Sequence, residues 1–506
     1  MGKARSRKLS RAPAAASPAG PIASSEPASP RRRALVYSLV SILLLVPCFW
    51  QSRLQAGDLS SHIYNAWLAK LIEYGRMPGL TIASQTTNVL FDLMLSGLYS
   101  LLGPEAAQRI AVSIAVLVFV WGAFAFVSKV AGRRPWHLLI CIAMLAYGWV
   151  FHMGFFNFYL SLGLCFWVLA LAWDPIPLRL GLCLPLLAAA YLAHALPVGW
   201  TACLLLYLWL TRNLAPRWRF LVTGGSLAAM LLVHWIVASN VITRWKPYQI
   251  VSSTGLDQVW VFDPKYHLVV MALLLIWGGL LVGLLRRSGV RQVASTPIFH
   301  ICVISAMGVF VMPGTVMIPG FRHALVYIAE RMSLGVGICV LALLGTAARP
   351  RALGRYAPLA AALIFFAFLF HDERALNSFE DGMQDAVARL EPGQRVVGGV
   401  EDPSLHTFAV THMIDRVCLG RCFSYGNYEP STAQFRVRAT AANPYVAFRY
   451  DDSVAIQRGL YIPQPADLPL YKLDLENGRF VIRAVPAGRP CGMKYWNTLV
   501  FPPPAG

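Results

Sequence analysis

The chain has 506 residues, of which 57% are hydrophobic and only 13% are charged, and its mean hydropathy is +0.54. These values exclude an ordinary soluble protein and are typical of a polytopic membrane protein. In a soluble protein the formal net charge of +20 would suggest a nucleic-acid partner. Here Lys and Arg fall mainly in short loops between apolar runs, so the charge pattern indicates membrane topology and argues against nucleic-acid binding.

The N-terminal segment, residues 1–33, is basic and rich in Ala, Pro and Ser, and we expect it to be a disordered cytoplasmic tail. Residues 34–50 form the first expected membrane span. A cleaved signal peptide is the alternative interpretation, but no small-x-small cleavage site follows, and Pro47 before Cys48 is a poor lipoprotein signature. The sequence therefore predicts an uncleaved signal anchor.

Polar residues follow this span in the segment from Gly57 to Ala66. On a helix, Asp58, His62 and Asn65 fall at positions i, i+4 and i+7 and share one stripe. Ionisable residues beside hydrocarbon are costly, so this stripe is a hypothesis for a functional site. An N-cap role for Asp58 would explain part of the pattern without any function.

Residues 51–106 are predicted to be the first outer loop, which carries two amphipathic surface helices. The second helix, near residues 83–103, could instead be a crossing, but that choice would place Arg133 and Arg134 on the outer side. Arg76 follows the first helix and is expected near the lipid headgroups, where it could contact substrate.

The remaining apolar runs alternate with basic loops and predict ten further spans, eleven in all, with residues 372–506 on the outer side. These ten spans are expected near residues 107–130, 135–152, 155–173, 178–195, 197–212, 218–238, 266–286, 296–312, 331–347 and 355–371.

Polar exceptions within these runs collect at the outer ends of the spans and are candidates for substrate binding. They are His152, Asn157, His194, His323, Glu330 and Arg331. Each histidine also has a simpler explanation, because a lone histidine at a helix end is more often packed or interfacial than a ligand. Their convergence on one face favours a site. The outer loop 239–265 mixes aromatic and charged residues, which fits a carbohydrate or headgroup site and an interfacial belt equally well.

Arg331 is expected to begin a span, and a guanidinium at that depth needs an anionic partner. Either Glu330 or a ligand phosphate could supply the negative charge. Adjacent residues on a helix diverge by about 100°, which disfavours a tight pair between Glu330 and Arg331. We therefore favour a phosphate or a lipid headgroup as the partner.

After the last span the charged fraction rises, and short apolar runs alternate with turn residues. This pattern predicts a small extracytoplasmic α+β domain over residues 372–506, with an opening helix at 377–390. Its cysteines, Cys418, Cys422 and Cys491, allow one disulfide and leave one thiol. The Cys418-x-x-x-Cys422 spacing is metal-like, but no second Cys or His pair of suitable spacing accompanies it, and we assign no metal there.

The layout of the chain resembles the membrane glycosyltransferases of the GT-C superfamily. The resemblance rests on a basic tail, one span, an outer loop that opens with the acidic Asp58 on a helix, Gly75-x-x-Pro78, a second amphipathic helix, and Gly132-Arg-Arg after the next span. It covers roughly residues 34–371 and points to the protein mannosyltransferase and aminoarabinose transferase branch, including bacterial relatives of unassigned substrate. The fold that it implies is all-α and polytopic, with about eleven transmembrane helices.

The resemblance implies transfer of a sugar from a polyprenyl-phosphate donor to a glycan, lipid or protein acceptor, on the outer face of a bacterial inner membrane. In that family the acidic residue of the first outer loop is a general base or orients the acceptor, and Asp58 occupies its position. The family's common second acidic residue is absent, because Leu59 follows Asp58. His62 is a candidate to supplement Asp58, and a requirement for a divalent cation, Mg²⁺ or Mn²⁺, stays open.

The chemistry of an inverting transfer gives the same candidates. One carboxylate must take the acceptor proton, and one positive group must stabilise the departing phosphate. Asp58 and Arg331 are the candidates for these two roles.

Two other functions stay open. A transporter or flippase of a lipid-linked glycan should carry ionisable residues near the bilayer midplane, whereas here they are predicted at the outer ends of spans. A catalytically inactive scaffold for envelope assembly is suggested by the missing second acidic residue. The sequence contains no phosphate-binding Gly-rich loop followed by Lys, no zinc-protease motif and no serine-hydrolase elbow, so ATP use and those hydrolytic reactions are unsupported.

Overall fold

A computed structural model of the chain describes residues 29–320, 322, 324–347 and 352–499. The chain divides into two compact units, residues 1–43 and 44–506. The described part of the first unit is most of α1 (Pro30–Leu45), so residues 30–33 of the predicted tail are helical. Residues 1–28 of that predicted tail lie outside the described residues.

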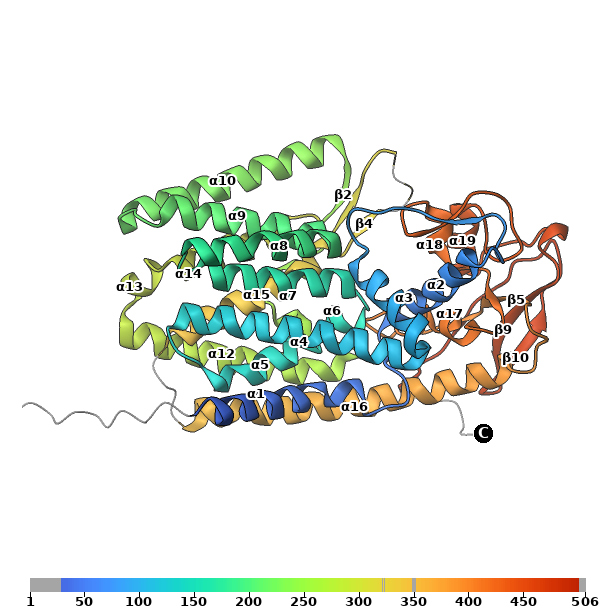
Figure 1. The fold of residues 1–506 in the computed structure, drawn as a ribbon, viewed down its shortest axis with the longest axis horizontal. Helices are drawn as coiled ribbons and strands as arrows, with labels where there is room; N and C mark the ends of the chain where they lie inside the picture. Colours follow the sequence, from blue (N-terminus) through green and yellow to red (C-terminus); the bar gives the residue numbers. More distant parts are fainter. Residues whose placement is uncertain (1–28, 321, 323, 348–351, 500–506) are drawn as a thin grey trace, which may run out of the picture. The chain divides into compact units, whose positions relative to one another are not determined.

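The second unit is mostly helical, and many of its helices run side by side (Figure 1). Within the described residues, four helices are long and apolar enough to cross a membrane, namely Pro104–Ala131, Pro216–Asn240, Pro264–Ser288 and Ile328–Gly345. Shorter apolar helices lie at Leu90–Leu102, Trp136–His152, Phe156–Ala172, Pro177–Ala193, Ala195–Thr211 and Pro297–Val311. The structure is thus compatible with a helical membrane protein.

The bounds of these helices lie close to the predicted spans. The helices are α4 (Pro104–Ala131), α5 (Trp136–Ala146), α6 (Trp149–His152), α7 (Phe156–Ala172), α8 (Pro177–Ala193), α9 (Ala195–Thr211), α10 (Pro216–Asn240), α12 (His267–Ser288), α14 (Pro297–Val311) and α15 (Ile328–Gly345). The span predicted at 135–152 is divided between α5 and α6, and the short helix η1 (Val46–Cys48) follows α1. Short helices in the loops are α11 (Gln249–Ser252), η2 (Leu256–Val259), η3 (Pro264–Tyr266) and α13 (Val290–Ala294).

Small residues allow α4 and α7 to pack closely. A Cβ atom at Gly163 would lie 2.7 Å from the Phe119 Cα, and one at Gly122 would lie 2.5 Å from the Gly163 carbonyl oxygen. Small residues at a helix crossing are typical of helices that associate in membranes, because they let the backbones approach. Several helices, including α4, α10 and α14, begin with a proline in the first turn, where a missing N–H costs no hydrogen bond.

The predicted first outer loop contains α2 (Gly57–Glu73) and α3 (Leu90–Leu102). Residues on both the apolar and the polar face of α2 are buried within the protein, including Leu59 and Asn65. The polar face of α2 is covered by C-terminal residues: α2 packs on α17 (Met413–Cys418). Beyond α2, β1 (Leu80–Ile82) pairs antiparallel with β8 (Val437–Ala439).

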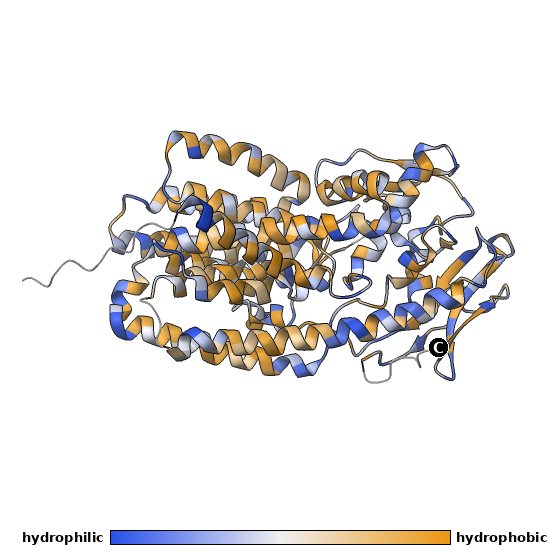
Figure 2. Cartoon of the chain, turned by 60° about the horizontal axis from the view of Figure 1, so that its bottom comes forward, coloured by the Kyte–Doolittle hydropathy of each residue, from blue (hydrophilic) through white to orange (hydrophobic). Residues whose placement is uncertain are grey.

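One long helix, α16 (Ala352–Val387), joins the expected last span to the C-terminal segment without a break. We expected a span at 355–371 and a separate helix at 377–390, with a domain boundary between them. No glycine or proline lies between residues 371 and 376 to end the helix, and the next strong stop is Pro392-Gly393. Figure 2 shows the apolar first part of α16 followed by a more hydrophilic second part.

The C-terminal segment contains a four-stranded sheet in the order β10-β9-β5-β7. Its strands are β5 (Arg395–Gly398), β7 (Phe423–Ser424), β9 (Leu470–Glu476) and β10 (Arg479–Ala484). β5 pairs in parallel with β7 and β9, whereas β9 and β10 form an antiparallel hairpin. Asn477 and Gly478 both have positive φ at the hairpin turn, which matches the twist of the two strands.

Further short elements complete the second unit. They are β6 (Val400–Glu401) paired with β11 (Lys494–Tyr495), the sheet β2 (Ile242–Arg244), β3 (Thr315–Met317) and β4 (Leu325–Val326), and the helices α18 (Tyr428–Thr432), α19 (Tyr450–Gln457) and η4 (Pro465–Asp467). The disulfide joins Cys418 to Cys422, and Cys491 is a buried free thiol.

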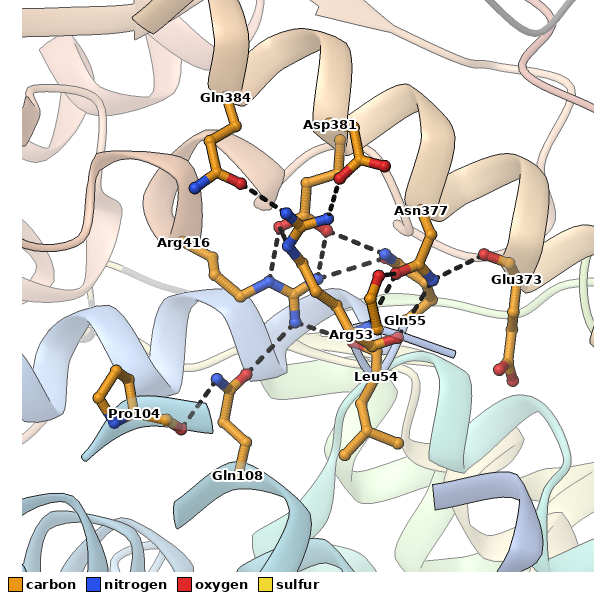
Figure 3. Close-up of polar contacts among 12 residues, drawn as sticks. Arg53, Leu54, Gln55, Pro104, Gln108, Glu373, Asn377, Asp381, Gln384 and Arg416 are labelled. Carbon is orange, nitrogen blue, oxygen red and sulfur yellow. Dashed lines mark hydrogen bonds and ion pairs between the residues drawn. The ribbon is translucent and has the colours of Figure 1, made fainter. Parts of the chain in front are cut away.

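Buried ion pairs fasten the first outer loop to α16 and α17 (Figure 3). The Arg416 guanidinium lies 2.6 Å from Glu380 Oε2, and its Nε donates to Glu380 Oε1 at 2.7 Å. Gln55 donates to the same carboxylate at 2.9 Å, and Arg53 lies 3.8 Å from it. Figure 3 also shows Arg53 reaching Asp381 on α16. The segment directly before Asp58 is therefore fastened to α16 and α17.

Candidate active site

Asp58 lies in the first turn of α2, where a negative charge interacts favourably with the helix dipole. Ala56 is the N-cap residue and its side chain makes no capping bond, so the N-cap interpretation of Asp58 is wrong. The Asp58 backbone N–H donates to the Met153 carbonyl oxygen at 3.0 Å. Gly154, with φ of +82°, passes so close that a Cβ there would lie 2.6 Å from the Asp58 nitrogen.

Arg331 comes to the same place from the first turn of α15. Its guanidinium carbon lies 3.7 Å from the centre of the Phe155 ring, directly after the glycine that touches Asp58. Arg331 and Asp58 interact electrostatically, but among the described residues they form no direct ion pair. Within the same described part of the chain, the buried Arg331 Nε has no hydrogen-bond partner. The guanidinium therefore keeps a donor for another group.

The backbone before α15 is in a rarely populated conformation. Tyr327, the N-cap residue of α15, has φ of +59°, in the left-handed region that non-glycine residues seldom adopt. Its ring contacts Trp149, Phe155 and Phe408, with centroid distances of 5.6, 6.1 and 5.7 Å. Such conformations persist where surrounding contacts fix them, and they collect at functional sites.

Two residues of the C-terminal segment complete the surroundings of Asp58. The His412 Nε2 lies 3.6 Å from Asp58 Oδ1, and the His412 ring lies 5.5 Å from the Tyr428 ring. Tyr428 in turn interacts electrostatically with both Asp58 and Arg331. Neither residue was predicted, because both lie far along the chain in a polar segment without helical periodicity. The only local signal was the His412-x-x-Asp415 spacing on one helix face.

His62 forms its ion pair with Asp92 on α3. Its Nδ1 lies 2.7 Å from Asp92 Oδ1 on α3, and Asn157 donates to the other oxygen of Asp92 at 2.7 Å. Asn157 also accepts a bond from the Phe91 N–H at 2.8 Å, so it holds the start of α3. His62 and Asp92 line a small pocket together with Asn65, Glu429 and Arg436. The stripe on α2 is thus divided between two neighbouring polar clusters.

Asn65 also has protein partners. Its amide nitrogen donates to the Ser61 carbonyl oxygen at 3.0 Å, and its amide oxygen accepts from Asn427 at 3.0 Å. Ser61 donates to Glu429 at 2.9 Å. Burial raises the pKa of Glu429 to about 7, against the opposing effect of His62. Asn65 therefore joins α2 to the segment that begins α18.

The His62–Asp92 pair gives a testable pH dependence. Burial alone would lower the pKa of His62, but the Asp92 carboxylate raises it to about 10. The stabilising contribution is fully present below the unfolded-state value of about 6.5 and is lost as pH rises through about 10. We expect His62→Gln to lower the thermal unfolding midpoint by several degrees near neutral pH and much less above about pH 10. An equal loss at both pH values, measured in detergent beside the exposed variant His371→Gln, would contradict this assignment.

Other predicted site residues have structural partners. His152 is fully buried, with its Nε2 3.1 Å from Glu373 Oε1. His194 caps α9, where its Nδ1 accepts from the Leu196 N–H at 3.2 Å. Arg76 is exposed and lies over the Tyr74 ring at 5.6 Å. Among the described residues, these three form no hydrogen bond or ion pair with Asp58, although His194 interacts electrostatically with Arg331. His323 lies outside the described residues.

Glu330 pairs with the outer loop and not with Arg331. Its Oε1 accepts from Tyr248 and lies 3.4 Å from the Lys246 ammonium. Both partners belong to the loop in which the sequence mixes aromatic and charged residues. The prediction that adjacent helix positions keep Glu330 and Arg331 from pairing agrees with this arrangement.

Metal use stays an expectation of the resemblance alone. Among the described residues, no group of three or more His, Cys, Asp or Glu side chains is arranged to hold a metal ion. The neighbours of Asp58 are an imidazole and a guanidinium, whereas Mg²⁺ prefers oxygen ligands. A divalent cation at Asp58 would therefore need further oxygen ligands from the substrate phosphate and water.

No protein-family model, curated protein or solved structure matches the chain.

Proposed function

We propose that the protein is a GT-C-type membrane glycosyltransferase that transfers a sugar from a polyprenyl-phosphate donor to an acceptor hydroxyl at the outer membrane face. The observation that carries the proposal is the meeting of Asp58 and Arg331. They come from helices far apart in the chain, both contact residues 153–155, and they do not neutralise each other in a direct ion pair among the described residues. A base and a cation held in this way suit a transfer from phosphate.

The proposed reaction uses one carboxylate and one guanidinium. Asp58 accepts the proton of the acceptor hydroxyl while the hydroxyl oxygen of the acceptor bonds to the anomeric carbon of the sugar. The bond from that carbon to the phosphate oxygen breaks, its electron pair stays on the phosphate, and Arg331 stabilises the added charge. Phosphate is already a good leaving group, so no second carboxylic acid is required, unlike in paired-carboxylate glycosidases.

The proposal includes the predicted topology. Eleven crossings place residues 1–33 in the cytoplasm and both Asp58 and the C-terminal segment outside, in a bacterial inner membrane. A polyprenyl donor would reach the site from the surrounding lipid. A flippase is the second candidate, but Asp58 and Arg331 each lie in the first turn of a helix, away from the middle of any candidate span.

The decisive experiment is a transfer assay with the purified protein in lipid vesicles. Radiolabelled polyprenyl-phosphate sugars are offered together with membrane extracts as acceptors. We expect label to move from the carrier to a new product. Donor binding without transfer, or movement of intact donor between leaflets, would replace the proposal with the scaffold or the flippase.

Arg331→Ala is expected to weaken use of the donor more than use of the acceptor. Hydrogen bonds to charged groups contribute about 1.5–3 kcal/mol, which corresponds to roughly 10- to 100-fold in the KM for the donor. Initial rates at varied donor and acceptor concentrations measure both constants. Arg489→Ala, at an exposed arginine of the C-terminal segment, is the matched control. Unchanged donor KM in Arg331→Ala would remove this residue from the phosphate site.

A further inference from the structure

We propose that His412 is a positioning residue that holds the Asp58 carboxylate in its reactive orientation, an inference that rests on the proposed function. The C-terminal segment would then supply part of the catalytic machinery to the first outer loop. His412 contacts Asp58 and is not placed against the substrate, so its role is exerted through the base.

The geometry is a chain of four polar side chains. His412 is buried, and its two ring nitrogens face two different carboxylates: Nε2 lies 3.6 Å from Asp58 Oδ1, and Nδ1 lies 3.3 Å from Asp415 Oδ2. Asp415 is itself fixed, because Ser424 Oγ donates to its Oδ1 at 2.5 Å. The hydrogen bond from Nδ1 to Asp415 limits rotation of the ring, so the longer ion pair at Nε2 joins Asp58 to a partner of fixed orientation.

Ser424 is anchored to α2 in turn. Its backbone N–H donates to the Tyr64 hydroxyl at 2.9 Å, and Tyr64 is completely buried on the helix that carries Asp58. The path from Asp58 through His412, Asp415 and Ser424 therefore returns to α2. In such a closed path each member is fixed by its neighbours. A movement of α2 that displaced Asp58 would disturb its contacts with both α17 and β7.

The charged surroundings of His412 favour its protonated form. Carboxylates face it from α2 (Asp58), α17 (Asp415) and β6 (Glu401), and the Tyr428 ring lies beside it on α18. Burial lowers the pKa of His412, but the two closest carboxylates, with Asp415 first, raise it to about 9. At neutral pH an imidazolium therefore stands beside Asp58 and attracts its carboxylate oxygen, which keeps the second oxygen available for the acceptor proton.

A merely structural role would give a different pattern of effects. If His412 only fastened the C-terminal segment to α2, its loss would lower stability and reduce the amount of active protein at every pH. A positioning role changes kcat and its pH dependence while the KM for the donor stays the same. A misplaced reacting group costs up to about 100-fold in rate, so we expect a 10- to 100-fold loss of kcat.

The first test does not need turnover. The protein with ¹⁵N-labelled histidine is titrated by NMR in nanodiscs, and the His412 signal is identified by its absence in His412→Gln. We expect titration near pH 9 in the unchanged protein and a downward shift in Asp58→Asn, because one attracting carboxylate is removed. An unchanged His412 titration in Asp58→Asn would overturn the inference. The exposed His371 serves as the internal reference.

The second test measures transfer from pH 6 to about pH 10. We expect the rate of the unchanged protein to fall as His412 loses its proton near pH 9, and this limb to be absent in His412→Gln. His371→Gln is the control with ordinary kinetics. An unaltered kcat and pH profile in a folded His412→Gln protein would overturn the inference, whereas absence of transfer by the unchanged protein would overturn the proposed function and leave the NMR result standing.

Discussion

Asp58→Asn is expected to lower the rate of sugar transfer by about 10²- to 10⁴-fold, the usual contribution of a general base. The amide has the same shape as the carboxylate but cannot accept the acceptor proton. The backbone bond from residue 58 to the Met153 carbonyl oxygen does not involve the side chain and should persist. Single-turnover measurements with bound donor isolate the chemical step, and the affinity for the donor should change little.

A matched control separates loss of the base from loss of any negative charge. Asp385 is an exposed carboxylate on α16. Asp385→Asn removes the same charge by the same isosteric change and should keep the rate within about twofold, as is usual for an exposed position. Near-normal single-turnover rates in Asp58→Asn would exclude this residue as the base.

The largest effect on stability is expected from Arg416→Met. Glu380 has only 1% of its side chain accessible, so removal of Arg416 leaves a buried charge without its main partner. Breaking a buried ion pair in this way costs about 3–5 kcal/mol. Thermal unfolding in detergent should show a clear fall in the midpoint, and α17, which carries His412, should lose its attachment to α16.

The double variant Arg416→Met with Glu380→Met tests the reason for that loss. Replacing both charges by apolar groups of similar size is often nearly neutral, so most of the stability should return. The exposed pair Arg483 and Glu476 provides the comparison, since removal of a surface ion pair costs only about 0–1 kcal/mol. Equal midpoints for the single and double variants would show that the unpaired Glu380 charge is not the cause.

The sequence was most informative about helices and least informative about contacts. Apolar length and basic loops located the helices, because hydrophobic periodicity is a local property. The same local pattern wrongly predicted a helix end within α16, because the hydropathy changes there while the helix continues. The i, i+4 spacing on α2 correctly placed Asp58 and His62 on one stripe, but it could not show that separate elements would engage them, His412 for one and Asp92 for the other.

Residues of the candidate site also differ in how far the sequence could predict them. Arg331 was predictable because a permanent charge at the end of an apolar run is conspicuous. His412 and Tyr428 lie in a segment of ordinary polarity, and only tertiary packing brings them to α2. The Tyr327 conformation could not be foreseen either, since a left-handed non-glycine residue reflects the contacts around it and not its own preference.

Because α16 is continuous, it would keep the C-terminal segment of the proposed enzyme at a fixed distance from the membrane. Its 36 residues extend about 54 Å at 1.5 Å per residue, whereas the hydrocarbon core of a bilayer is about 30 Å thick. A helix of this length would hold the C-terminal segment, and the His412 ring with it, at a constant height above the lipid. The polyprenyl chain would hold the donor in the bilayer, so the donor phosphate could reach the site at only one height. The length of α16 would therefore select substrates by the distance that their lipid chain allows between the phosphate and the bilayer.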